Sequence, residues 1–325
     1  MRNRFKYYFL CSLLCGIAIG NIGCDSEDVS YTSRMHNLPT DLDLSDVYFV
    51  NQDIGYVSAG GIFTAGLIFG TEDGGETWDT IDVYGTGVNS LSYRNGIFTA
   101  SICGQRMYSS TDFTNWSFTN AYLGWWNWQK HTRLADNRVL LVGGENFGRG
   151  FIHLHIPNQA GVLLKDTFDH ELTDIITTPN RTIHAVGYGL IMKSTDEGNS
   201  WIPSSITGDF FKGVDFVDDN TGYVVGEYGS VYKTENGGNS WQSCRAGNSV
   251  FTDQTKLFRD IAFLDASTGF LVGTNNMIYR TTNGGKVWKR INNLDGYADF
   301  NAIRIQEGKA YVTGQEGNLL IIDLE

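Results

Sequence analysis

Two histidines stand where they could share a metal ion. His153 and His155 alternate on a predicted strand, so their side chains face the same side of a sheet, and neutral imidazole is a common metal ligand. Further ligands would have to come from the histidines elsewhere in the chain, at His131, His170 or His184. Such pairs more often fill the polar face of a sheet, and no Cys/His ligand spacing occurs. We therefore predict no metal and no cofactor.

Carboxylates are the second group that could do chemistry, because paired Asp or Glu side chains hydrolyse glycosidic bonds. The chain has 36 Asp and Glu residues, but the sequence does not give their separation in space. A sialidase would also need three arginines for the substrate carboxylate and an Arg-Ile-Pro segment, whereas here the Arg-Ile pairs continue into Asn292 and Gln306. We predict no catalytic residues and favour a protein without catalysis. A sialidase-like or other glycan-degrading glycoside hydrolase is the alternative.

Three tryptophans form the strongest candidate binding surface. Trp125, Trp126 and Trp128 lie within four positions, and on a strand Trp126 and Trp128 would share one face while Trp125 faces the other way. An indole exposed in a connecting loop can stack on a sugar ring or on the side chains of a partner. Burial between neighbouring repeats is the alternative. We expect a protein or glycan ligand here.

The N-terminal segment carries the features of an export signal. Three bases precede an apolar run that extends to residue 22, which is shorter than the about 20 residues of a spanning helix. The run ends in the tetrapeptide Asn-Ile-Gly-Cys, which resembles a bacterial lipobox. This predicts a signal peptide over residues 1–23 and lipidation of Cys24. An ordinary signal peptide cut elsewhere is the alternative.

Acidic residues follow Cys24 from Asp25 to Asp28. A similar stretch directs Bacteroidetes-type lipoproteins to the cell surface, and this resemblance implies a chain anchored by lipid to the outer membrane and exposed outside the cell. The alternative is a solvated tether, which any acidic tail can provide. We predict an acidic tether and closing strand over residues 24–40, followed by one domain over 41–325.

Composition excludes some partners. The net charge is −12, with 24 Lys and Arg against 36 Asp and Glu, and such a chain repels phosphate backbones, so we expect no nucleic-acid partner. The 39 glycines favour many short strands and tight turns. After the signal and Cys24 only Cys103 and Cys244 remain, and we expect two buried thiols rather than a disulfide. We also expect a monomer.

A hairpin pattern recurs along the chain. Residues 49–57, 216–226 and 263–273 each begin with Phe, continue through a polar turn, and reach a Gly six positions after the Phe. In two of the copies the second half reads Gly-Tyr/Phe-x-Val-Gly, and the first copy reads Gly-Tyr-Val. Two apolar runs on either side of a polar turn predict two antiparallel strands.

A second pattern, Ser/Thr-x-Asp/Asn-x-Gly-x-x-Trp, follows each hairpin. The polar side chains can bond the backbone of their own turn, Gly allows positive φ, and Trp re-enters a strand as a packing anchor. A degenerate copy at residues 110–116 is one residue shorter. The structural residues that we assign to this turn are Asp73, Trp78, Asp112, Trp116, Asp196, Trp201, Asn236, Trp241, Asn283 and Trp288.

The spacing of these patterns gives the number of units. Residues 311–322 align without a gap on 223–234, which places the equivalent of Gly222 at Ala310. The distance from Gly55 to Ala310 fits six steps of about 42 residues, the length of a four-stranded propeller blade. This predicts an all-β fold, a seven-bladed β-propeller of four-stranded antiparallel blades. The seventh unit ends before its outermost strand, so we predict closure by an N-terminal strand within residues 29–36.

The two patterns together resemble the BNR or Asp-box repeat, and their order is closest to photosystem II stability/assembly factor-like propellers. This resemblance covers roughly residues 40–325. It implies a rigid ring that binds a protein or a polymer, with the Asp boxes at the blade rim rather than in an active site. We therefore expect a non-catalytic surface or periplasmic lipoprotein that binds a partner protein or a glycan.

Overall fold

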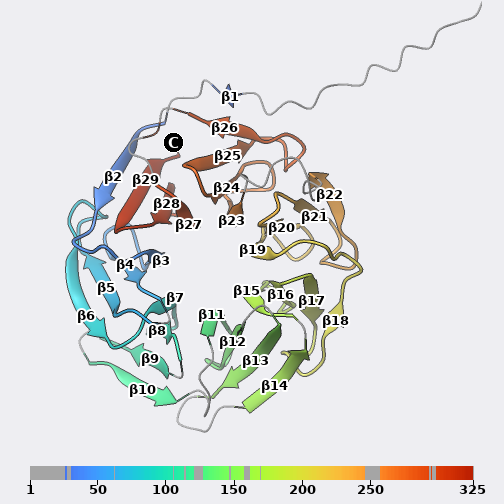
Figure 1. The fold of residues 1–325 in the computed structure, drawn as a ribbon, viewed down its shortest axis with the longest axis horizontal. Helices are drawn as coiled ribbons and strands as arrows, with labels where there is room; N and C mark the ends of the chain where they lie inside the picture. The colour runs from blue at the N-terminus through green and yellow to red at the C-terminus, as the bar shows by residue number, and fades with distance from the viewer. Residues whose placement is uncertain are drawn as a thin grey trace, which may run out of the picture.

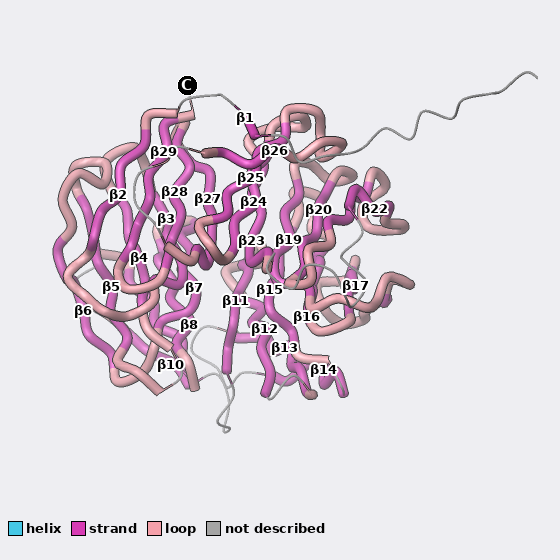
Figure 2. The backbone as a smooth tube through the Cα atoms, turned by 45° about the horizontal axis from the view of Figure 1, so that its top comes forward, coloured by secondary structure: helices cyan, strands magenta, loops and turns pink. Residues whose placement is uncertain are grey.

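The computed structural model describes most of the propeller. The described residues are 26–27, 31–61, 63–104, 106–112, 115–120, 127–145, 148–156, 162–168, 170–245, 257–292, 294 and 298–324. All the regular elements among them are β-strands, as Figures 1 and 2 show. Within these ranges no helix is long and apolar enough to span a membrane.

Seven antiparallel sheets stand around a central axis (Figure 1), so the predicted seven-bladed propeller is confirmed. Each blade runs from an innermost first strand to an outermost fourth strand. Blade 1 consists of β3 (Leu44–Phe49), β4 (Gly55–Ala59), β5 (Gly66–Thr71) and β6 (Asp79–Tyr84). Blade 2 consists of β7 (Val88–Arg94), β8 (Ile97–Ile102), β9 (Arg106–Ser110) and β10 (Ser117–Asn120). Blade 3 consists of β11 (Asn127–Arg133), β12 (Val139–Glu145), β13 (Arg149–His155) and β14 (Val162–Phe168).

The other four blades repeat this order. Blade 4 consists of β15 (Leu172–Thr177), β16 (Ile183–Gly187), β17 (Leu190–Ser194) and β18 (Ile202–Pro203), and blade 5 of β19 (Phe211–Phe216), β20 (Gly222–Gly226), β21 (Val231–Thr234) and β22 (Gln242–Arg245). Blade 6 consists of β23 (Phe258–Phe263), β24 (Gly269–Gly273), β25 (Met277–Thr281) and β26 (Lys289–Ile291). Blade 7 contains β27 (Phe300–Gln306), β28 (Lys309–Gly314) and β29 (Asn318–Asp323).

The N-terminal segment supplies the missing outer strand of blade 7. Strand β2 (Ser33–Asn37) pairs antiparallel with β29, and Met35 lies opposite Leu320. The predicted closure is therefore confirmed, and it removes the open edge that β29 would otherwise present. The short strand β1 (Ser26–Glu27) adds to the outer edge of blade 6, where it runs parallel to β26.

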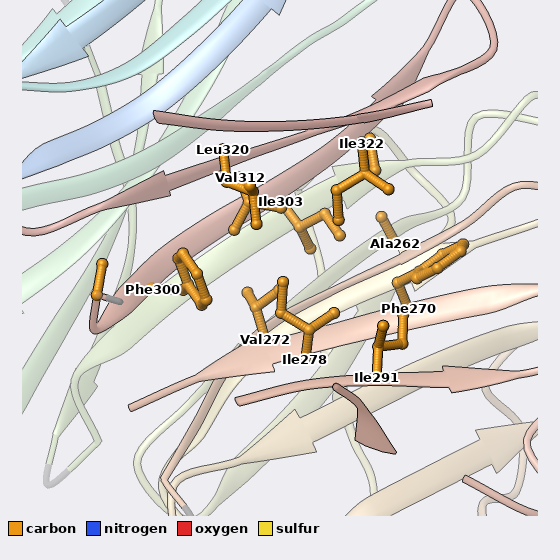
Figure 3. Packing of buried hydrophobic residues seen from close by; sticks show 12 residues of the cluster. Ala262, Phe270, Val272, Ile278, Ile291, Phe300, Ile303, Val312, Leu320 and Ile322 are labelled. Carbon is orange, nitrogen blue, oxygen red and sulfur yellow. The ribbon is translucent and has the colours of Figure 1, made fainter. Parts of the chain in front are cut away.

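Apolar side chains fill the space between neighbouring blades. The second strands β4, β20 and β24 are buried along their whole length, because an adjacent blade covers each face. Between blades 6 and 7 the side chains of Phe270, Ile278 and Phe300 meet in one cluster (Figure 3). Burying one such side chain contributes roughly 1.5–3 kcal/mol relative to leaving it exposed, so the clusters between blades hold the ring together.

The leading Phe of the repeat joins adjacent blades. Its ring stacks on an aromatic ring from the second strand of the preceding blade and meets the Asp-box Trp of its own blade edge-on. The stacked pairs are Phe49 with Tyr311, Phe216 with His184 and Phe263 with Tyr223, with centroids 4.0, 4.0 and 3.8 Å apart. The edge-on partners are Trp78, Trp241 and Trp288, at 6.0, 6.0 and 5.9 Å.

This stacking explains the Gly that follows each Phe. A Cβ atom built on Gly222 would lie 2.5 Å from the Phe216 ring, and the same distance separates Gly55 from Phe49 and Gly269 from Phe263. Real Cβ contacts are never this short. The Gly of the hairpin therefore makes room for the Phe ring.

The Asp-box turns connect the third and fourth strands and close on themselves. In blade 1 the Asp73 carboxylate accepts hydrogen bonds from the Thr71 hydroxyl (2.7 Å) and from the Thr77 backbone amide (2.9 Å) and hydroxyl (2.6 Å). The Trp78 indole donates to the Gly75 carbonyl at 3.1 Å. Blade 4 repeats this pattern around Asp196. The boxes of blades 1, 5 and 6 are also tied to the first hairpin of their blade, as where the Gly74 amide donates to the Asp53 carbonyl at 2.8 Å.

Candidate functional site

A β-bulge at the same place in all seven innermost strands directs one side chain per blade into the channel. In each strand the ladder to the second strand shifts by one residue across the bulged position, which is the second residue of six strands and the third residue of β11. Such bulges re-aim a side chain and are frequent near binding sites. We call the seven bulged residues the mouth ring: Ser45, Asn89, Gln129, Thr173, Lys212, Arg259 and Asn301.

The whole mouth ring lines one cavity of about 370 Å³ at the end of the channel where the innermost strands begin. Five of its side chains are neutral hydrogen-bonding groups, and the two cations, Lys212 and Arg259, lie on adjacent blades 5 and 6. The ring itself contains no carboxylate and no apolar side chain, but Asp43, Asp174, Glu227 and Asp260 also line the cavity. Such a surface can bind peptide amides or sugar hydroxyls and favours a negative charge near blades 5 and 6.

Three members of the mouth ring tie adjacent blades together. Each donates to the first carbonyl of the next innermost strand: Ser45 to Val88, Thr173 to Phe211 (2.6 Å) and Asn301 to Leu44 (3.0 Å). The hydrogen bonds of these three side chains connect neighbouring blades, so the side chains stabilise the fold.

The other members are held more loosely. The Gln129 amide donates to Glu171 at 3.3 Å, the Lys212 ammonium lies 3.9 Å from Glu227, and Arg259 donates to the side chain of Asn301. A long hydrogen bond, a distant ion pair and a hydrogen bond to a neutral amide can each be exchanged for a ligand at small cost. Gln129, Lys212 and Arg259 are therefore the ring residues that are best placed to bind.

Four aspartates in the channel connect innermost strands; Asp46 is buried and the other three are half-buried. One carboxylate oxygen of each accepts the amide of the next residue, and the other accepts an amide of the next blade at 2.7–3.0 Å. The pairs of Asp and next-blade amide are Asp46 with Leu91, Asp174 with Val214, Asp215 with Phe263 and Asp260 with Ile303.

The charges near these aspartates differ. Burial raises the pKa of Asp46, but Arg304 at 3.0 Å and Lys130 at 3.4 Å outweigh it and hold the pKa well below the usual range. Burial raises the pKa of Asp215 to about 6 and also raises the pKa of Asp174 and Asp260. A raised carboxyl pKa is typical of a general acid. Here, however, both oxygens of each carboxylate are bonded to backbone amides, so these groups position blades.

The opposite mouth of the channel is a second cavity of about 430 Å³. It is lined by the later residues of the innermost strands, including Ile176, Ala262 and Phe263. The His131 ring accepts or donates a hydrogen bond with Ser92 at 2.7 Å, and burial lowers its pKa to about 3. Burial likewise lowers the pKa of the Arg133 guanidinium to about 10. This mouth also carries charged residues, among them Lys130, Arg304 and Asp215, and its histidine is neutral.

The predicted site residues are distributed over the molecule. Trp125 and Trp126 lie outside the described residues, as does the side chain of Trp128, whose backbone stands in β11 opposite Gly143. Cys24 and residues 1–23 also lie outside the described part of the chain. The Asp boxes lie between third and fourth strands, away from the channel. Sequence reasoning therefore named none of the mouth ring.

The histidines and cysteines do not converge on a site. His153 and His155 are buried on β13, and across the described ranges no group of three His, Cys, Asp or Glu side chains could hold a metal ion. Cys103 and Cys244 are separate free thiols, the first buried and the second half-buried, so the expected full burial holds for Cys103 only.

One signal in the sequence marks the mouth ring. Ser45, Lys212 and Arg259 each stand four positions before the leading Phe of a repeat, so an alignment extended backwards from the hairpins reaches the ring. The bulge that turns these side chains into the channel leaves no comparable mark in a single sequence.

The geometry described here defines a class, the BNR-type seven-bladed propeller. Residues 245–323 match the family described as "Photosynthesis system II assembly factor YCF48". Two solved structures have a similar fold. The structure of YCF48 bound to D1 peptide matches with 17% identity over 93% of this chain and 100% of that chain, with a TM-score of 0.72. YCF48 from Cyanidioschyzon merolae matches with 19% identity over 89% of this chain and 98% of that chain, with a TM-score of 0.68. The chain is therefore a BNR-type propeller that resembles the photosystem II assembly factor, as the repeats predicted.

The same fold also occurs in an enzyme. Virginiamycin B lyase from Staphylococcus aureus matches with 10% identity over 91% of this chain and 100% of that chain, with a TM-score of 0.75. At such low identities these likenesses show a shared fold. A comparison with curated protein sequences found no match.

Proposed function

We propose that this propeller is a non-catalytic binding protein that holds an extended segment of a partner protein at the mouth ring. The observation that carries the proposal is the ring itself: seven strands place seven polar or cationic side chains around one cavity of about 370 Å³. An extended peptide presents backbone donors and acceptors along its length, and side-chain amides, hydroxyls and cations can match them. The resembling YCF48 structure carries a bound peptide of D1, which supports a protein ligand over a glycan.

The enzyme alternative has less support. Hydrolysis of a glycosidic bond needs two carboxyl groups that are free to exchange protons or attack the sugar. The aspartates of the channel accept backbone amides with both oxygens. Two further carboxylates line the cavity beside the mouth ring: Asp43 accepts the Glu316 amide at 3.3 Å, and Glu227 lies 3.9 Å from the Lys212 ammonium. A glycan remains a second candidate ligand through Trp125, Trp126 and Trp128, which sequence reasoning selected.

We also propose that the chain is exported and attached by lipid at Cys24 to the outer membrane, facing the cell exterior. The support is the lipobox-like sequence and the acidic stretch that follows it. A ring fixed close to a membrane would meet partner proteins of that membrane.

The test of binding uses two double variants of the full chain. Gln129→Ala with Lys212→Ala removes two ring side chains, and Gln242→Ala with Lys286→Ala removes the same two types at exposed positions away from the channel. The amount of envelope protein that is crosslinked to the Gln242/Lys286 control variant should equal the amount crosslinked to the wild type. The amount crosslinked to the Gln129/Lys212 ring variant should fall about tenfold or more, because a few residues at the centre of an interface dominate binding. Equal capture by both pairs would contradict the proposal. So would sugar release by the wild type from an array of glycans.

A further inference from the structure

Three junctions between blades are built alike on the Asp-box side of the ring. In each, the box of one blade lies against an aromatic side chain of the preceding blade. A Cβ on Gly238 would lie 2.6 Å from the His184 ring, and one on Gly285 would lie 2.9 Å from the Tyr223 ring. The third junction joins blade 7 to blade 1, and there Tyr311 takes the position of His184 and Tyr223.

Two of these junctions contain a lysine beside the aromatic ring. Lys193 stands directly opposite His184 in the ladder, and Lys233 stands opposite Tyr223. The Lys193 ammonium donates to the carbonyl of Gly237, the first glycine of the next box, at 3.3 Å. The Lys233 ammonium lies 3.6 Å from where a Cβ of Gly284, the equivalent glycine, would stand. In both junctions a lysine thus covers the first glycine of the box.

The junction of blades 7 and 1 lacks this lysine. The residue opposite Tyr311 is Ile321, which is buried against Gly75. In front of Gly74, the first glycine of this box, there is a cavity of about 430 Å³. Its polar lining consists of Gln52, Asp53, Asp73, Glu307, Lys309, Tyr311 and Asp323. Four carboxylates therefore face one ammonium.

The Asp box of this junction is also more acidic than the boxes of the two lysine-containing junctions. Asp73 stands where the two lysine-containing junctions have the neutral Asn236 and Asn283. The carbonyl that accepts the first glycine's amide belongs to Asp53 here, and to Asn220 or Ser267 in the other two. Hydrogen bonds from Thr77 and Thr71 hold the pKa of Asp73 below its usual range, so its charge persists. This junction lacks the ladder lysine and gains two carboxylates at these positions, while Lys309 stands where the other two junctions have Thr182 and Thr221.

A buried hydroxyl provides an independent sign of a missing ligand. Tyr311 is fully buried and lines the cavity, and its hydroxyl has no hydrogen-bond partner among the residues that the structure describes. The hydroxyl of the equivalent Tyr223 has no hydrogen-bond partner there either, but the Lys233 ammonium lies 5.7 Å from the centroid of its ring, and in the described part of the chain no such cation lies beside Tyr311. Burial and the charges of Glu307 and Asp323 raise its pKa to about 12, so the group stays a neutral phenol whose oxygen can accept from an ammonium. A buried polar group without a partner is unfavourable unless a ligand or water satisfies it.

We propose that this cavity, the seam pocket, binds the side chain of a lysine from a partner protein. The incoming ammonium would take the place that Lys193 and Lys233 take in the other junctions, between Tyr311 and the acidic rim. Lys309 on the pocket wall forms no ion pair within 4.0 Å in the described structure. Asp53, Glu307 and Asp323 therefore remain available, whereas the Asp73 carboxylate is bonded within its own box. Only the source of the lysine, a protein, rests on the function proposed above.

Hexalysine is the probe for this pocket, and its binding to the full chain is measured by isothermal titration calorimetry. Glu307→Gln with Asp323→Asn removes two rim charges and is expected to weaken binding about tenfold. Asp41→Asn with Glu145→Gln removes the same net charge at exposed positions outside the pocket and should weaken it less than about twofold. Equal weakening by both pairs would show attraction to the general negative charge and would overturn the proposal.

Two further measurements separate a built pocket from a charged surface. Tyr311→Phe keeps the ring that stacks on Phe49 and removes only the hydroxyl, so it should weaken hexalysine binding while the unfolding temperature stays close to that of the wild type. Hexalysine with acetylated side chains should not bind, and binding of that peptide would overturn the proposal. Neither outcome alters the mouth ring, whose own variants test the proposed function separately.

Discussion

At position 222 the absence of a side chain is a requirement of packing between blades. The backbone of β20 passes so close to the Phe216 ring that a Cβ would lie 2.5 Å from it. The Phe216 ring cannot retreat, because it is stacked on His184 of blade 4 at 4.0 Å and meets Trp241 edge-on. One methyl group would therefore disturb the contact between two blades.

We expect Gly222→Ala to lower the free energy of unfolding by about 1–3 kcal/mol, the usual cost of forcing an extra group into a packed core. Urea denaturation followed by tryptophan fluorescence measures this change. Gly85→Ala is the matched control, because Gly85 is exposed and a Cβ there meets nothing within 4 Å. An equal effect at both positions would mean that the loss comes from the glycine backbone and not from the Phe216 ring.

At the same scale, the channel aspartates show what a single sequence does not reveal. Asp46, Asp174 and Asp260 occupy one repeat position, the residue after the mouth ring, whereas Asp215 stands two positions later in its strand. All four nevertheless bond to an amide of the next blade. Their role depends on how neighbouring strands approach each other, and this distance is absent from any local pattern.

Among the elements, β2 has the largest effect for its length, because it joins the beginning of the ring to its end. Bonded pairs alternate along an antiparallel ladder. The Asp323 amide donates to Thr32 and the Leu38 amide donates to Gly317, so even-numbered residues of β2 carry the bonds to β29. His36 is thus a bonded position, while the amide of Asn37 points away from β29.

His36→Pro should therefore open the ring, and Asn37→Pro should leave it closed. Proline removes an amide hydrogen, which at position 36 costs a hydrogen bond to β29 and about 1–3 kcal/mol of stability. The amide of Asn37 points away from β29, so proline at this position removes no hydrogen bond to β29. Proline is tolerated on an edge strand where the amide faces solvent. Differential scanning calorimetry compares the two variants. Similar unfolding temperatures would show that closure by β2 does not limit the stability of the ring.

For the whole molecule, the sequence predicted the repeated blades but not the side chains that the closed ring brings together. Seven blades and their closure followed from the period between Gly55 and Ala310 and from the missing last strand, because each blade repeats the same local contacts. The mouth ring joins side chains from all seven blades, and only closure of the ring brings Gln129 and Lys212 into one cavity. Local periodicity sets the number of blades, whereas the binding surface depends on their arrangement in space.

The N-terminal segment also determines how the whole ring would be presented to a membrane. Cys24 lies two residues before β1, which pairs with the outer edge of blade 6, so a lipid on Cys24 would attach at most about 7 Å from Ser26. We expect Cys24→Ala to move the chain from the membrane fraction to the soluble fraction of the cells, as measured by immunoblotting after ultracentrifugation. Cys103→Ala serves as the control, because Cys103 is a buried thiol inside the ring and its loss should leave the chain in the membrane fraction. A Cys24→Ala chain that still sediments with membranes would contradict the lipid anchor, and would direct attention to binding of a membrane partner by the ring itself.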